Sequence, residues 1–179
     1  MPAERPQSIS TAPAPTDVRS QRRARTGRRI FVILLVVFLA LGALGFYGVR
    51  TRTASGTGGG YEVSVTYASV SRPGLATPWS VEVTRRGGFP EGLVLAVTSS
   101  YFDAFDENGF SPTPVEETDD GLRTIWRFAP SDADTMEVSL DARIEPGVQL
   151  TRLKGMVDVR DGGSGQLVVQ IPFSTFVMP

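Results

Sequence analysis

MEVSLDARIE, residues 136–145, alternates apolar and polar side chains more strictly than any other part of this chain. Met136, Val138, Leu140 and Ile144 lie on one side of the alternation, and charged or hydroxyl side chains lie on the other. A period of two residues is typical of a β-strand with one buried and one exposed face. The segment therefore predicts a strand that packs against a core.

Similar alternation recurs on both sides of this segment, between turns rich in Gly, Pro and Asp. Residues 99–109 instead suggest a single helical turn ended by Asn108-Gly109. About seven or eight short strands with one helical turn predict an all-β domain over residues 61–179, an immunoglobulin-like antiparallel β-sandwich. Besides residues 136–144, the expected strands cover residues 61–67, 79–83, 93–97, 115–118, 122–129, 152–160 and 166–177.

Upstream of the strands, Ile30–Val49 reads IFVILLVVFLALGALGFYGV and carries no charge. A helix of this length covers roughly the 30 Å hydrocarbon thickness of a bilayer, so the segment predicts one N-terminal transmembrane helix. A cleaved signal peptide is the alternative, because Ala40-Leu41-Gly42 and Ala43-Leu44-Gly45 offer small residues at the spacing of a cleavage site. The apolar run exceeds the usual 7–15 residues of a signal peptide, which favours an uncleaved anchor.

Charge on the two sides of the span predicts its orientation. Residues 1–29 carry seven arginines and two acidic residues, whereas residues 50–60 carry two arginines. The positive-inside rule places the N-terminus in the cytoplasm and residues 61–179 outside it. Residues 1–29 are expected to be a disordered basic tail, and residues 50–60 a flexible Gly/Ser/Thr linker. The tail should contact the anionic inner leaflet through Arg22, Arg23, Arg25, Arg28 and Arg29.

The net charge of −1 conceals an acidic β domain. Residues 61–179 carry nine basic and seventeen acidic side chains, a balance that argues against nucleic acid as a partner. The chain has neither cysteine nor histidine. Disulfides, Ser-His-Asp and Cys-His catalysis and His/Cys zinc sites are therefore excluded, and the sequence predicts a protein that is not an enzyme and has no cofactor.

One acidic loop, residues 102–109, is a weak candidate for a calcium site, with Asp103, Asp106 and Glu107 as the ligands. Calcium prefers several oxygen ligands, but the spacing does not match a known calcium loop. Carboxylates that cap a turn are the favoured interpretation. Asp132 and Asp134 are likewise interpreted as turn residues.

Two tryptophans and the only lysine have simple structural interpretations. Trp79 and Trp126 could stack on a sugar, but both continue apolar strand faces and are expected in the core. Lys154 falls at a polar position of a predicted strand and is expected on a solvated face.

Four segments resemble a group of actinobacterial membrane-anchored proteins with one immunoglobulin-like ectodomain. They are TYASVSRPGLATPWSVEV (66–83), YFDAFDENGFSPTP (101–114), LDARIEPGVQ (140–149) and FVMP (176–179). The resemblance implies a protein of the same build and transfers no functional residue.

The sequence thus predicts a single-pass membrane protein of the cell envelope that presents its β domain to a protein partner, with an integral membrane protein as one candidate. The alternative function is a ligand-, sugar- or calcium-binding module, or less favourably a hydrolytic one, that uses the loop at residues 102–109.

Overall fold

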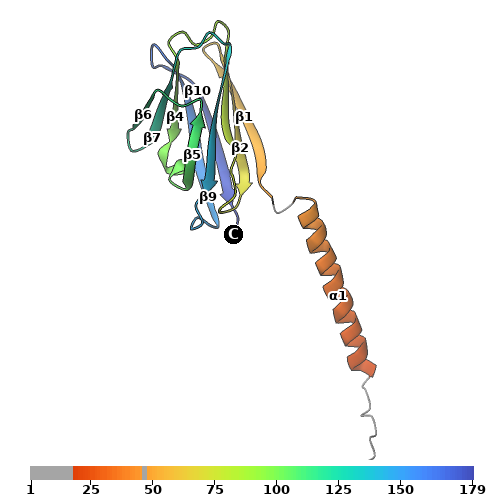
Figure 1. Ribbon diagram of the computed structural model, residues 1–179. Coiled ribbons are helices and arrows are strands. Elements are labelled where there is room, and N and C mark those ends of the chain that lie inside the picture. The colour runs from red at the N-terminus through yellow and green to blue at the C-terminus, as the bar shows by residue number, and fades with distance from the viewer. Residues whose placement is uncertain (1–17, 46–47) are drawn as a thin grey trace, which may run out of the picture. The chain divides into compact units, whose positions relative to one another are not determined.

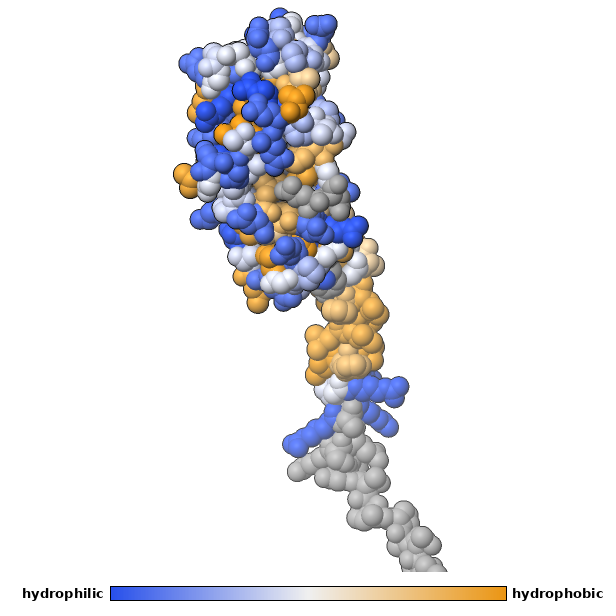
Figure 2. Space-filling model, turned by 60° about the vertical axis from the view of Figure 1, so that its left-hand side comes forward, coloured by the Kyte–Doolittle hydropathy of each residue, from blue (hydrophilic) through white to orange (hydrophobic). Residues whose placement is uncertain are grey.

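The computed structural model describes residues 18–45 and 48–179. Contacts divide the chain into two units, Met1–Tyr47 and Gly48–Pro179. The described part of the first unit contains helix α1, Val18–Ala43 (Figure 1). Its Arg25–Ala43 portion is long and apolar enough to cross a membrane, and Figure 2 shows its apolar side chains as a continuous band with hydrophilic side chains toward the N-terminus.

Both ends of α1 differ from the sequence-based expectation. Residues 18–29 are helical, where a disordered tail was predicted; residues 1–17 of that tail lie outside the described chain. Arginine and alanine are strong helix formers, and a helix propagates easily once the apolar segment has nucleated it. The helix stops at Ala43 rather than Val49, because Gly45 adopts a φ of 70° and the left-handed conformation ends helices.

The second unit is mostly β, with the four-residue helix α2 as its only described helix, which confirms the all-β prediction. Its ten strands form one continuous sheet in the order β5-β8-β3-β2-β10-β9-β4-β7-β6, with β1 paired to β2 (Figure 1). The strands are β1 (Arg50–Gly58), β2 (Tyr61–Ser71), β3 (Trp79–Arg85), β4 (Leu93–Thr98), β5 (Phe105–Ser111), β6 (Glu116–Asp119), β7 (Arg123–Phe128), β8 (Thr135–Ile144), β9 (Thr151–Asp161) and β10 (Leu167–Val177).

The sheet curls so that strands distant in its order touch through their side chains. The Trp79 ring on β3 lies 6.1 Å from the Trp126 ring on β7, and the Phe110 ring on β5 lies 4.5 Å from Trp126. Strand β2 connects the two halves of the sheet. Its residues 61–67 pair with β3, and Val70 and Ser71 pair with β10. The alternating apolar residues of both halves meet in one core.

Strand β1 occupies the segment for which a flexible linker was predicted, and the β domain therefore begins before Tyr61. Residues 50–58 pair antiparallel with β2 along their full length. The glycines of this segment permit close packing against β10. A Cβ at Gly56 would lie 3.1 Å from the Val169 side chain, and one at Gly58 would strike the carbonyl oxygen of Val168. Because these glycines have no side chain, β1 and β10 can approach each other closely, and the glycines do not make the segment a flexible linker.

Substituting Gly58 by alanine is expected to lower the free energy of unfolding by roughly 1–3 kcal/mol, because the added methyl group overlaps the Val168 backbone. Urea unfolding of the full chain in detergent measures the change. Gly147→Ala is the matched control, since a Cβ there meets nothing within 4 Å. Equal stability of the two variants would show that β1 is not packed against β10.

The helical turn predicted for residues 99–109 is correct only at its start. Helix α2 covers Ser99–Phe102, and residues 105–111 continue as strand β5. This strand pairs with β8 and places Phe105 in the core at 8% exposure. Cross-strand pairing and burial outweigh the local turn propensity of its polar residues.

Candidate functional site

The residues proposed as calcium ligands follow α2 or lie on β5, where one loop was expected. Asp103 follows α2 and Asp106 lies on β5, and both side chains are exposed. Glu107 is also on β5, but its side chain lies outside the described set, and Asp106 has Arg143 as its cross-strand neighbour. Among the described residues, no three His, Cys, Asp or Glu side chains form a group that could hold a metal ion.

The remaining single residues lie where the sequence placed them. Trp79 and Trp126 are 3% and 1% exposed and belong to the core. Asp134 Oδ1 accepts a hydrogen bond of 2.9 Å from the Gly87 backbone N–H, which is a turn role. Lys154 is exposed on β9.

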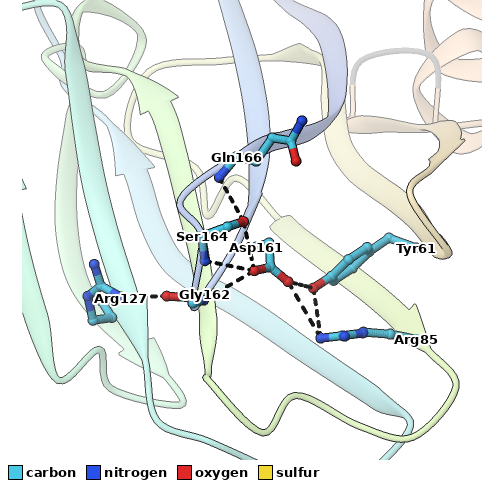
Figure 3. A network of polar contacts seen from close by, with 8 residues as sticks. Tyr61, Arg85, Arg127, Asp161, Gly162, Ser164 and Gln166 are labelled. Atoms are coloured by element: carbon cyan, nitrogen blue, oxygen red, sulfur yellow. Dashed lines mark hydrogen bonds and ion pairs between the residues drawn. The ribbon is translucent and has the colours of Figure 1, made fainter.

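The densest polar network joins the start of β2 to the end of β9 (Figure 3). The Tyr61 hydroxyl donates to Asp161 Oδ2 at 2.8 Å, and Arg85 Nη1 donates to the Tyr61 oxygen at 3.0 Å. Asp161 Oδ1 accepts from the Ser164 N–H and hydroxyl at 2.9 and 3.0 Å. Each charged group in this network is engaged by the others, so the network fastens the β9–β10 turn to β2.

Hydrogen bonding and burial shift the pKa values of Asp161 and Tyr61 in this network. The Ser164 backbone N–H, followed by the Tyr61 hydroxyl, lowers the pKa of Asp161 to about 2. Burial, followed by the hydrogen bond to Asp161, raises the pKa of Tyr61. Asp161 is therefore ionised at neutral pH and stabilises the turn as an acceptor.

Acid titration provides a prediction for Asp161. The carboxyl has a lower pKa in the folded state than in the unfolded state, so its stabilising effect is present above about pH 4 and is lost as the pH falls toward 2. Asp161→Asn should lower the melting temperature at neutral pH, with the difference from the parent protein closing over that window. Asp141→Asn, which removes an exposed carboxylate on β8, is the control for the loss of one negative charge. A difference for Asp161→Asn that stays constant from neutral pH to pH 2 would refute the assignment.

A second constellation has the opposite character, because its charged side chains form no ion pair among the described residues. Two adjoining surface hollows of about 340 and 420 Å³ share Tyr67, Arg152 and Ser174. Arg52 on β1 borders one hollow and Lys154 on β9 the other. We call these two hollows together the basic groove. Its further lining residues are Ser69, Val70, Gly155, Met156, Pro172, Phe173 and Phe176.

The basic groove is positively charged and has an aromatic wall. No acidic side chain lines it, and Arg52, Arg152 and Lys154 form no ion pair among the described residues. The Arg152 guanidinium lies 6.0 Å from the centroid of the Phe176 ring. By contrast, Arg123 pairs with Asp158 at 3.4 Å and Arg127 with Glu116 at 3.3 Å. Unpaired cations beside hydroxyls and apolar surface can bind an anionic group.

Of the residues that line the basic groove, only Lys154 was singled out from the sequence, and it was expected on a solvated strand face. The spacing of Arg152 and Lys154 was an available signal, because alternate residues of a strand share a face. Arg52 could not have been added, since its segment was expected to be a linker.

No protein-family model matches the chain, and no curated protein is similar to it at a significant level. The resemblance to actinobacterial membrane-anchored proteins therefore stays a prediction. The function proposed below rests on the geometry of the chain itself.

Proposed function

We propose that this chain is a non-catalytic, membrane-anchored accessory protein of the cell envelope that presents an immunoglobulin-like domain to a protein partner outside the cytoplasm. The observation that carries the proposal is the short connection between helix and sheet. Helix α1 ends at Ala43 and β1 begins at Arg50. The six residues 44–49 join them, and the seven Cα–Cα steps from Ala43 to Arg50 span about 25 Å at most, so a short chain tethers the domain to the apolar helix.

Strand order supports the immunoglobulin-like assignment. Immunoglobulin sandwiches place strands A, B, E and D in one sheet and strands C, F and G in the other. Here β2, β3, β8 and β5 have the neighbours expected of A, B, E and D, and β4, β9 and β10 have those expected of C, F and G. The β6–β7 hairpin is an addition beside β4.

Arginines at the N-terminal end of the span support the proposed orientation. Arg25, Arg28 and Arg29 are exposed on the last turns before the apolar segment. Arginines on this side favour a cytoplasmic N-terminus and attraction to an anionic inner leaflet. In the signal-peptide alternative, cleavage near Ala43-Leu44-Gly45 would release the domain.

The titratable groups support a role without catalysis. Asp119 and Asp161 have lowered pKa values because hydrogen bonds, first of all those from the backbone N–H groups of Gly121 and Ser164, favour their ionised forms. Burial raises the pKa of Tyr101 to about 12, so its phenol stays neutral. These groups stabilise turns and the core. The alternative, a ligand-, sugar- or calcium-binding or hydrolytic module that uses the loop at residues 102–109, is disfavoured, because residues 105–111 form a strand and both tryptophans are buried.

Crosslinking in native membranes followed by affinity purification tests the proposal. We expect a membrane protein to co-purify with the full chain. When Ile30–Val49 is exchanged for an unrelated span, we expect less of this protein to co-purify, which would assign part of the recognition to the helix. Retention after the exchange would assign recognition to the β domain alone. Absence of any crosslinked protein from both chains would refute the accessory role.

A further inference from the structure

The basic groove lies at the end of the sheet where the chain enters the β domain. Arg50, the first residue of β1, pairs with Val70, and Val70 also pairs with Phe176 near the end of β10. Thr151, the first residue of β9, pairs with Val177. Figure 1 shows the C-terminus at this end, beside the end of β2.

Chain length sets an upper limit on the distance between this end and helix α1. Arg52 follows Ala43 by nine residues, which span about 30 Å when fully extended. Under the proposed anchoring, this length of chain tethers the basic groove to the bilayer. A tethered surface meets the membrane at a high effective concentration, so even weak contacts can be populated.

Charge distinguishes this end from the rest of the domain. Residues 61–179 carry an excess of acidic side chains, which an anionic bilayer repels. The basic groove is lined by Arg52, Arg152 and Lys154 without an acidic neighbour, and such a site attracts anionic headgroups. Attraction at one end combined with repulsion elsewhere favours one orientation of the domain on the bilayer.

Leu150 supplies an independent observation beside the basic groove. It directly precedes β9, two residues before Arg152, and its side chain is 71% exposed. It is also the only non-glycine residue among those described with a positive φ, 50°. A left-handed conformation is uncommon and strained for a bulky side chain, so the surrounding structure must hold Leu150 in it. A leucine held out toward solvent gains favourable burial when it enters an apolar phase.

We propose that the basic groove and Leu150 dock the β domain onto the bilayer that anchors it. Arg52, Arg152 and Lys154 bind the phosphate groups of anionic phospholipids, and Leu150 enters the interfacial region beside them. This inference rests on the membrane anchoring proposed above.

The absence of cysteine allows a direct test in the full chain. Leu150→Cys carries an environment-sensitive fluorophore, and the protein is reconstituted into vesicles of phosphatidylcholine alone or of an equal mixture with phosphatidylglycerol. Leu167→Cys is the matched control, because Leu167 is an exposed leucine at the opposite end of β10. Flotation of the vesicles reports anchoring separately, so a chain that fails to float refutes the anchoring and not the docking surface alone.

We expect the probe at residue 150 to shift to the blue and to be quenched by a lipid-borne quencher in the mixed vesicles, while the probe at residue 167 is unchanged. Each basic residue near an anionic surface strengthens binding about fivefold, so Arg152→Gln with Lys154→Gln should weaken docking about 30-fold. Arg86→Gln, an exposed arginine at the far end of β3, should have no effect. Identical spectra from residue 150 in both vesicles, or undiminished docking after the double substitution, would overturn the proposal.

Discussion

Replacing Trp126 by alanine is expected to lower the free energy of unfolding by about 3–5 kcal/mol. Trp126 is 1% exposed, and its ring lies 5.5 Å from Phe102 as well as close to Trp79 and Phe110. The indole thus joins the two halves of the curled sheet, and its removal leaves a cavity between them. Urea unfolding of the full chain in detergent measures the loss, with Trp79 fluorescence as the probe.

Trp126→Phe is the matched control for this cavity. The Nε1 atom of Trp126 is buried without a hydrogen-bond partner, so phenylalanine removes no hydrogen bond. We expect this variant to lose clearly less stability than the alanine variant. If alanine were tolerated, or if both variants were equally unstable, Trp126 would not be the packing link between the two halves.

Introducing two arginines into the span is expected to have the largest effect on membrane retention. Ile33 and Val37 are exposed on α1, one turn apart near the middle of its apolar part. An arginine at the centre of a span costs about 2.5–3.5 kcal/mol, so Ile33→Arg with Val37→Arg should disfavour insertion by about 5–7 kcal/mol. Membrane fractionation measures the result, and we expect the double variant to leave the membrane fraction.

Ile33→Leu with Val37→Leu is the control for the double substitution, since it keeps the apolar character of the helix. This variant should stay with the membrane after carbonate extraction. Full retention of the arginine variant would mean that α1 does not hold the chain in a bilayer.

The strands that sequence predicted well are those with one apolar and one polar face. Strands β3 and β8 were expected almost within their observed bounds, because their burial alternates along the chain. Strands β1 and β5 were missed for a physical reason. Their residues are mostly glycine or polar, so their strand conformation depends on pairing with β2 and β8, which local sequence does not encode.

The basic groove could not be predicted for a related reason. Its cationic side chains lie on β1 and β9, and most of its other lining residues lie on β2 and β10. Arg152 and Lys154 are visible as a pair two residues apart, but their approach to Arg52 and Phe176 follows from the pairing of β9 with β10 and of β1 with β2. Contacts of this kind depend on topology rather than on spacing.

Cysteine labelling tests the membrane topology most directly, because the chain has no cysteine of its own. Single cysteines replace Ser20 before the apolar segment and Ala133 in the exposed turn between β7 and β8. We expect a membrane-impermeant maleimide to label Ala133→Cys in intact cells and Ser20→Cys only after permeabilisation. Labelling of residue 20 in intact cells, protection of residue 133, or release of a shortened chain that lacks residue 20 would refute the anchored arrangement.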